Sequence, residues 1–184
     1  MINYGCISSE DKTKGNNQEN DEKIINQKVN FSDSATIFYK DSIIYKTPKD
    51  KVYQTTGVNL FKEGTLKIIT NIDGNCGACI HKLNQWRKLI KKAKNIDKLN
   101  IIFFIITEDF DFFHNELYPK IQDIRYPIVL DKKYAFLKKN NLPQHIKYHT
   151  LLLDTNNRII ITGNPIYNDE LMELYREEIN KRIN

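Results

Sequence analysis

The chain has 184 residues, of which 40% are apolar, and its 28 basic and 23 acidic side chains give a net charge of +5. This length allows one domain of ordinary size with a tail, and no apolar stretch approaches the roughly 20 residues that a membrane-spanning helix needs. Because the basic residues are interleaved with acidic ones, we expect no nucleic-acid partner. Three cysteines are too few for a disulfide-built scaffold.

Residues 1–30 are rich in Asn, Gln, Lys, Glu and Asp and contain almost no aromatic side chain. They cannot bury enough apolar surface to offset the cost of ordering, so we expect a disordered polar tether followed by a domain over residues 31–184. Cys6 suggests a lipid attachment site, because a bacterial lipoprotein begins at a lipid-modified cysteine and continues as a polar tether. Only five residues precede Cys6, so the apolar part of a signal peptide is missing. The alternatives are a trimmed or misassigned start and an incidental thiol.

Residues 31–59 are expected to form a small β extension at the start of the domain. The runs 35–39 and 42–46 are rich in β-forming residues and flank Lys40 and Asp41, which predicts a hairpin. Pro48 breaks this pattern, and residues 51–54 predict a further short strand.

Residues 60–184 alternate between strand and helix patterns and form the predicted core. Strands are expected at 66–72, 99–106, 126–131, 149–154 and 158–162, and helices at 79–94, 109–122, 133–139 and 169–182. The run 99–106 is almost wholly apolar, which is typical of a strand buried on both faces in the middle of a parallel sheet. Apolar residues at intervals of three and four predict the inward faces of the helices. These faces comprise Ile80, Leu83, Trp86, Ile90 and Ala93, then Phe112, Phe113, Leu117 and Ile121, and finally Leu171, Leu174, Tyr175 and Ile179.

Cys76 and Cys79 stand where the first core strand passes into the first helix, separated by Gly77 and Ala78. Two thiols at this spacing can close a small disulfide, and the first lies near the positive end of the helix dipole, which favours its thiolate. The small residues between them leave room for an incoming protein disulfide. The pair predicts dithiol–disulfide exchange, with Cys76 as nucleophile and Cys79 as the shielded resolving thiol. Two buried, inert thiols are the alternative.

The order of these elements resembles the thioredoxin-like superfamily, in particular its branch of bacterial envelope thiol–disulfide oxidoreductases and peroxiredoxin-like proteins. Residues 73–79, 126–131 and 149–160 carry the resemblance, which covers roughly residues 60–183. It implies an α/β fold, a three-layer α/β/α sandwich with a central mixed sheet, here with the small N-terminal β extension. It places Asn75, Gly77, Ala78, His149 and Thr150 in the groove that receives the substrate.

The resemblance also implies an activity: reduction or exchange of disulfides in envelope proteins through Cys76 and Cys79. The partners would be protein thiols or disulfides and an upstream electron donor. No cofactor is expected beyond the redox-active Cys76–Cys79 disulfide. The expected location is the bacterial cell envelope, periplasmic or at the outer surface, with a lipid anchor at Cys6. The sequence does not fix the oligomeric state or the direction of electron flow.

Three positions depart from the pattern of this superfamily. Asn75 stands where active members commonly have Trp, and His81 and Lys82 occupy the region where envelope members often carry a carboxylate. His149 stands where these proteins place a cis-proline opposite the thiols. Because a cis bond before any residue but proline costs about 3 kcal/mol, we expect a trans bond at His149 and a different local loop.

His149 has several interpretations. As an imidazolium it would lower the pKa of Cys76, or its ring would shuttle protons; a hydrogen-bonded loop residue is the plainer account. A zinc site would need Cys76, Cys79 and His149, with His145 or His81. The spacing from Cys79 to His145 is far longer than in small zinc fingers, so we expect no metal.

The predicted function is therefore that of a thiol–disulfide oxidoreductase. The alternative is a thioredoxin-fold binding or accessory protein with weakened catalytic parts, which the missing cis-proline favours and the intact pair of thiols opposes. A peroxidase ranks lower, because the chain has no peroxiredoxin-type Pro/Thr/Cys constellation.

Overall fold

The computed structural model describes residues 24–30, 34–38, 53–56, 64–92, 99–120 and 128–183. Its strands form one seven-stranded mixed sheet in the order β2-β1-β5-β4-β3-β6-β7. β4 (Leu99–Ile106) lies between β3 (Leu66–Asp73) and β5 (Ile128–Asp131) and runs parallel to both. Every residue of β4 except Asn100 is buried, which confirms the prediction of a central strand covered on both faces.

Antiparallel strands extend the sheet on both sides of the three parallel strands β3, β4 and β5. Beyond β3 lie β6 (Thr150–Leu153) and β7 (Ile159–Thr162), which form the predicted hairpin. The five predicted core strands are thereby confirmed, with bounds that differ by at most two residues. Beyond β5 lie β1 (Ser34–Phe38) and β2 (Tyr53–Thr56), which belong to the predicted β extension. The run 42–46, expected to form a hairpin with residues 35–39, lies outside the described residues.

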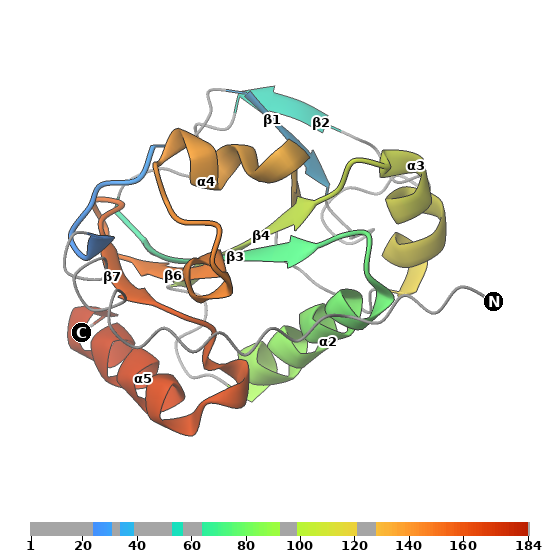
Figure 1. The fold of residues 1–184 in the computed structure, drawn as a ribbon. Helices are drawn as coiled ribbons and strands as arrows, with labels where there is room; N and C mark the ends of the chain where they lie inside the picture. The colour runs from blue at the N-terminus through green and yellow to red at the C-terminus, as the bar shows by residue number, and fades with distance from the viewer. Residues whose placement is uncertain are drawn as a thin grey trace.

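Helices cover both faces of the sheet, as a three-layer sandwich requires (Figure 1). α2 (Gly77–Lys92) and α5 (Asp169–Ile183) pack on one face, where Leu83, Trp86 and Tyr175 are buried. α4 (Ala135–Lys139) packs on the other face through Phe136 and Leu137. No helix in the described part of the chain is long and apolar enough to cross a membrane.

The segment predicted as one helix over residues 109–122 changes its helical type along its length. It begins as α3 (Phe110–Phe112), continues as a π-helix (Phe113–Leu117) and ends as a 3-10 turn (Tyr118–Lys120). A wider and then a tighter turn alter the angle between successive side chains. Phe113 and Leu117 therefore face inward as predicted, whereas Phe112 is 42% exposed and its predicted inward position is wrong.

One predicted core residue of α5 is also wrong. Leu174 is 44% exposed, whereas Tyr175 is buried and Leu171 and Ile179 pack partly against the core. The helix thus presents a stripe of residues spaced by four to the sheet, and Leu174 lies one position, or about 100°, away from it. The side chains of Ile80, Ile90, Ala93 and Ile121 lie outside the described residues.

Residues 24–30, expected to be the end of the tether, pack against the sheet. Ile24 and Val29 are only 6% and 2% exposed. The backbone N–H groups of Asn26 and Val29 donate hydrogen bonds to the carbonyl oxygens of Ile159 and Asn157, at 2.8 and 2.9 Å. This segment therefore pairs along the β7 side of the sheet and belongs to the packed domain. Residues 1–23, including Cys6, lie outside the described residues.

Candidate functional site

Cys76 immediately precedes α2, and Cys79 lies in its first turn. The helical turn brings the two residues together, with the backbone N–H of Cys79 donating to the carbonyl of Cys76 at 3.0 Å. Neither cysteine is bonded in a disulfide here, and both are partly exposed. The thiol of Cys79 also donates a hydrogen bond to the sulfur of Cys76. The sulfurs therefore lie side by side and within reach of a visiting molecule.

The turn that carries Cys76 is tied closely to the neighbouring strand. The backbone N–H of Gly74 donates to the carbonyl of Ile106 at 2.7 Å. A Cβ at Gly74 would lie 2.5 Å from Cγ2 of Ile105 and 3.2 Å from the backbone oxygen of Ile106, so only glycine allows this approach. The turn is thus held against the end of β4, which fixes the position from which α2 starts.

Asn75 holds the same turn from its other side. The carboxylate of Asp73 accepts hydrogen bonds from the backbone N–H of Asn75 at 2.8 Å and from its side-chain amide at 3.2 Å. The hydroxyl of Thr107 donates to the side-chain oxygen of Asn75 at 2.8 Å. Asn75, which the sequence assigns to the substrate groove, therefore binds residues at the ends of β3 and β4 with its side chain.

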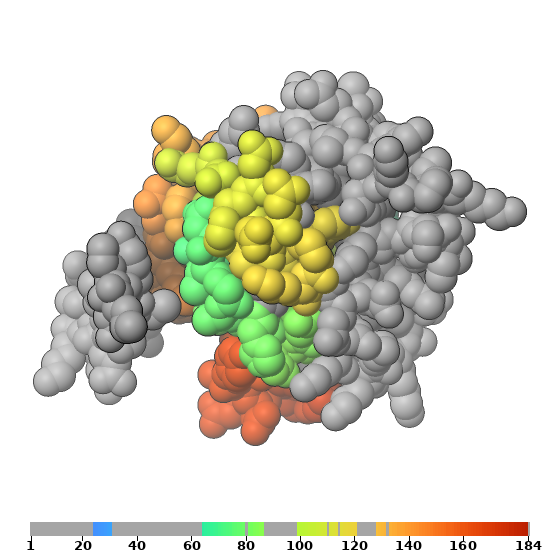
Figure 2. All heavy atoms as spheres, turned by 90° about the vertical axis from the view of Figure 1, so that its right-hand side faces the viewer, coloured from blue at the N-terminus to red at the C-terminus, as the bar shows by residue number. Residues whose placement is uncertain are grey.

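The two residues between the thiols are open to solvent. Gly77 and Ala78 are both exposed, and a Cβ built on Gly77 would meet no atom within 4 Å. Figure 2 shows the segment that joins β3 to α2 (green) at the molecular surface, beside the segment that follows β4 (yellow). A partner disulfide can therefore approach the thiols from this side.

Burial and charge set the ionisation of the resolving thiol. Desolvation, followed by the hydrogen bond to Cys76 and the negative charge of its thiolate, raises the pKa of Cys79 to about 12. The ammonium of Lys82, one turn further along α2, acts in the opposite direction. The first turn of α2 contains no acidic residue, so none there offsets the positive end of the helix dipole. Cys79 therefore stays protonated until its surroundings change.

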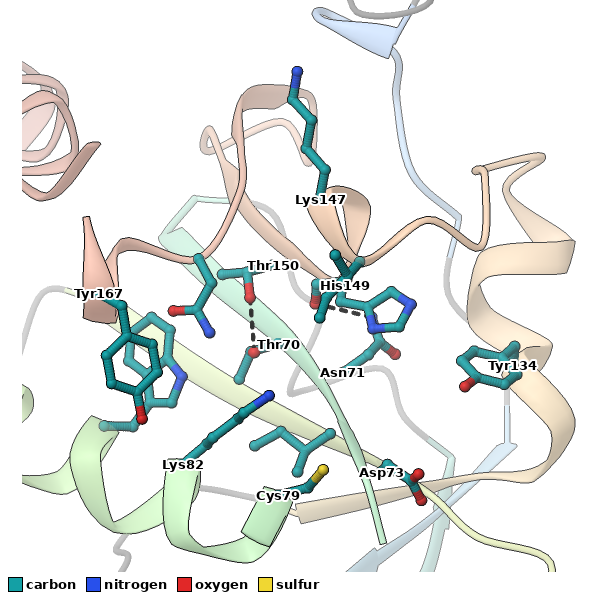
Figure 3. Close-up of a pocket in the computed structure, with 14 residues that line it drawn as sticks. Thr70, Asn71, Asp73, Cys79, Lys82, Tyr134, Lys147, His149, Thr150 and Tyr167 are labelled. Carbon is teal, nitrogen blue, oxygen red and sulfur yellow. Dashed lines mark hydrogen bonds between the residues drawn. The ribbon is translucent and has the colours of Figure 1, made fainter. Parts of the chain in front are cut away.

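A cavity of about 480 Å³ opens beside Cys79, between α2, the turn that precedes β6 and the segment that follows β7 (Figure 3). At its base the hydroxyls of Thr70 on β3 and Thr150 on β6 share a buried hydrogen bond of 2.9 Å. Lys82 points into it from α2, and His149 and Tyr134 lie on the opposite side. Thr150 and His149, both predicted for the substrate groove, therefore share this cavity with Cys79.

His149 ends a 3-10 turn (Ile146–His149) just before β6. Its peptide bond is trans as predicted, since the described residues contain no cis bond. Its carbonyl accepts a hydrogen bond from the side-chain amide of Asn71 at 3.2 Å, and its ring nitrogen Nε2 lies 3.1 Å from the carbonyl oxygen of Gln144. The ring also packs near Tyr134, with the centroids 5.7 Å apart.

These contacts favour the interpretation of His149 as a hydrogen-bonded loop residue. Burial lowers the pKa of its imidazole below the usual 6.5, so the ring is neutral at neutral pH. A neutral ring does not supply the positive charge that the imidazolium interpretation needs.

The side chains of the zinc alternative are not brought together. In the part of the chain that the structure describes, no group of three His, Cys, Asp or Glu side chains is placed to hold a metal ion. His81 instead contacts Gln85 at 2.9 Å on the exposed surface of α2, and His145 accepts a hydrogen bond from the backbone of Lys147.

Sequence reasoning missed the wall of the cavity that β3 provides. Thr70 and Asn71 are polar residues at the end of an otherwise largely apolar run, and both are buried. Buried polar side chains need partners, so this pair was a signal of a polar site behind the thiols. Trp86 also lines the cavity. Because it lies on the apolar stripe of α2, the sequence pattern indicated only a core residue at this position.

No protein-family model matches the chain, and no curated protein matches it in sequence. Solved structures do match. A candidate protein disulfide isomerase from Bacteroides thetaiotaomicron has a TM-score of 0.55 at 16% identity, over 85% of this chain and 88% of that one. A candidate thiol:disulfide interchange protein DsbE from Chlorobium tepidum has a TM-score of 0.54 at 10% identity, over 83% and 97%.

A third match is the C-terminal domain of a candidate thiol–disulfide oxidoreductase from Bacteroides thetaiotaomicron, with a TM-score of 0.53 at 14% identity, over 86% of this chain and 99% of that domain. These matches span most of each chain. The chain therefore has the thioredoxin-like fold that its sequence pattern predicts.

Proposed function

We propose that this protein is a thiol–disulfide oxidoreductase that reduces or exchanges disulfides of cell-envelope proteins through Cys76 and Cys79. The observation that carries this proposal is the pair of partly exposed thiols, hydrogen-bonded to each other at the start of α2. A bare CxxC sequence has many uses, whereas this placement in a thioredoxin-like fold suits disulfide exchange.

The reaction begins at Cys76. Its thiolate attacks one sulfur of the partner's disulfide, a Cys76–partner disulfide forms, and the partner's other sulfur leaves as a thiolate that takes a proton. The thiolate of Cys79 then attacks the sulfur of Cys76. The Cys76–Cys79 disulfide forms and the second partner sulfur leaves and is protonated. Two electrons pass from the cysteine pair to the partner, and a dithiol or another electron donor must then return the pair to its reduced form.

The surroundings of Cys79 suit this order of events. In the free protein its pKa of about 12 keeps it protonated, so it does not compete with Cys76 for the partner. Once Cys76 is bonded to the partner, it no longer carries the negative charge that opposes ionisation of Cys79. The Lys82 ammonium then favours the second thiolate. The resolving thiol is thereby activated after the first step.

The names of the similar structures support the same activity, since two of the three describe thiol–disulfide chemistry and the third a disulfide isomerase. We extend the proposal to a bacterial envelope location, periplasmic or at the outer surface, with a lipid anchor at Cys6. Protein disulfides and an upstream electron donor are the proposed partners. We propose no cofactor beyond the redox-active disulfide of Cys76 and Cys79.

An insulin-reduction assay with dithiothreitol as the electron donor tests the activity. The parent protein should accelerate precipitation of the insulin B chain, and Cys76→Ser should fall to the rate of dithiothreitol alone. Cys79→Ser should accumulate a Cys76–insulin mixed disulfide that a non-reducing gel resolves. Equal rates for the parent and Cys76→Ser would refute the oxidoreductase.

That refuting result would support the second candidate, a binding or accessory protein. The observation that favours this candidate is the 3-10 turn at His149, whose carbonyl is already bound by Asn71. The carbonyl at the position opposite the thiols is thus engaged within the protein and does not offer itself to a partner's backbone.

A further inference from the structure

Two buried polar atoms in the wall of the cavity beside Cys79 have no hydrogen-bond partner in the described structure. Trp86 Nε1 is a donor on a side chain that is 0% exposed, and Asn71 Oδ1 is an acceptor on a residue that is 5% exposed. Both residues line the 480 Å³ cavity. Because buried polar groups in folded proteins are nearly always paired, these two atoms are available to a water or to a polar group of a ligand bound in the cavity.

The charges around the cavity favour an anion near α2. The ammonium of Lys82 points into the cavity, whereas the side chain of Lys147 points away from it (Figure 3). No ion pair in the described part of the chain involves Lys82. The carboxylate of Asp73 lies at the other end of the wall and is bound by Asn75. Lys82 and Trp86, both on α2, therefore offer a cation and an N–H to one acceptor.

Asn71 offers the complementary group on β3. The NH2 group of its side-chain amide donates a hydrogen bond to the carbonyl of His149 at 3.2 Å. The oxygen of the same amide, Oδ1, has no donor and can accept a further hydrogen bond. A ligand that satisfies all three residues must carry an anionic acceptor and an N–H close to it. An acidic side chain and the backbone of the same peptide supply this combination.

We propose that the cavity binds an acidic residue next to the cysteine of the partner protein. The carboxylate accepts hydrogen bonds from Lys82 and from Trp86 Nε1, and a backbone N–H of the partner donates to Asn71 Oδ1. This inference rests on the proposed function, since the segment arrives with the disulfide that Cys76 attacks. It assigns a substrate preference to the site: disulfides flanked by Asp or Glu over those flanked by neutral or basic residues.

The chain provides its own probe for this cavity, because Trp86 is its only tryptophan. The ligands are short peptides in which an S-methylated cysteine stands beside Glu, Gln or Lys, so that they bind without reacting. Titration of the full chain with each peptide, followed by the fluorescence of Trp86, yields a dissociation constant for each. We expect the Glu peptide to bind about tenfold more tightly than the Gln peptide, and the Lys peptide to bind most weakly.

Lys82→Gln is the test variant, and Lys147→Gln is the matched control, because Lys147 lines the cavity but points outward. Lys82→Gln should reduce the Glu-to-Gln ratio to about one, and Lys147→Gln should retain it. The ratio is the readout, so a general loss of affinity does not mimic the result. A parent ratio of one, or a ratio that survives Lys82→Gln, would overturn the inference.

Trp86→Phe provides a second test with calorimetry in place of fluorescence. The variant keeps an aromatic side chain where Trp86 packs edge-on against Phe103, and it removes the N–H together with part of the indole. It should weaken the Glu peptide several-fold more than the Gln peptide, and an equal effect on both would contradict the proposed contact. Because no peptide reacts, failure of the insulin assay and failure of these titrations are separate results.

Discussion

The thiol of Cys79 donates a hydrogen bond to the sulfur of Cys76, so the ionisation of each cysteine depends on the state of the other. The cause is the single helical turn between them, closed by the bond from the Cys79 N–H to the Cys76 carbonyl. A thiolate at Cys76 keeps Cys79 protonated, and a disulfide at Cys76 removes that restraint. The coupling gives the two sulfurs an order of reaction that the CxxC spacing by itself does not.

Replacing Cys76 by Ser should lower the pKa of Cys79 from about 12. The substitution removes the negative charge of the Cys76 thiolate while the burial of Cys79 persists, so the fall is partial. We expect alkylation of Cys79 by iodoacetamide at pH 9 to become about tenfold faster, which corresponds to one pKa unit. The rate is measured by mass spectrometry against the same residue in the parent, and an unchanged rate would contradict the coupling.

Replacing Lys82 by Gln should have the opposite effect on the same thiol. The Lys82 ammonium lowers the pKa of Cys79, so its loss raises that pKa and reduces the fraction of resolving thiolate. We expect the Cys76–partner mixed disulfide to last several times longer at pH 7, and the difference to shrink as the pH rises towards 10. Quenched-flow gels across this pH range follow the intermediate. Lys147→Gln serves as the control, and equal lifetimes at pH 7 for Lys82→Gln and the parent would exclude this role.

Gly74 and Gly77 flank the nucleophile and should respond differently to alanine. At Gly74 the added Cβ would lie 2.5 Å from Cγ2 of Ile105, and 3.2 Å from the backbone oxygen of Ile106, which cannot give way without moving β4. We expect Gly74→Ala to lower the free energy of unfolding by about 1–3 kcal/mol. At Gly77 the new methyl group meets nothing within 4 Å, so Gly77→Ala should change it by less than about 0.5 kcal/mol. Urea unfolding of the two variants compares them directly, and similar losses would disprove the packing argument.

The central sheet could be predicted from the sequence because its signals are local. The run 99–106 is nearly all Ile, Leu and Phe, and such a stretch is stable only between two covered faces. The position of the thiols at the start of α2 followed equally from the change of pattern at Cys76. In both cases the residues that carry the signal are the residues that form the structure.

The predictions that were wrong depend on contacts between distant segments or on a local change of helix type. Ile24 and Val29 are isolated apolar residues in a polar stretch, and only the presence of Ile159 and its neighbours across the chain makes them buried. Phe112 is exposed because the helix changes its pitch at Phe113, which no spacing of apolar residues indicates. The cavity beside Cys79 is likewise assembled from five separate stretches of chain, residues 70–73, 79–86, 134, 146–150 and 164–167, so the buried polar pair Thr70 and Asn71 signals a polar site without revealing which groups face it.

Protonation of His149 should destabilise the protein as the pH falls below about 6.5. Burial lowers the pKa of this imidazole in the folded state, with the positive charges of His145 and Lys82 acting in the same direction. The Gln144 carbonyl and Asp73 oppose the shift and do not cancel it. The unfolded chain therefore binds more protons near and below pH 6.5, and the stability that the neutral ring provides above this pH is lost on acidification.

His149→Gln, which retains a hydrogen-bond donor for Gln144, should flatten the fall in the free energy of unfolding between pH 7.5 and 5.5. Urea titrations at several pH values measure both slopes, and His81→Gln, on the exposed surface of α2, is the control that should keep the parent's slope. Identical slopes for the parent and His149→Gln would show that the buried imidazole does not control stability in this range.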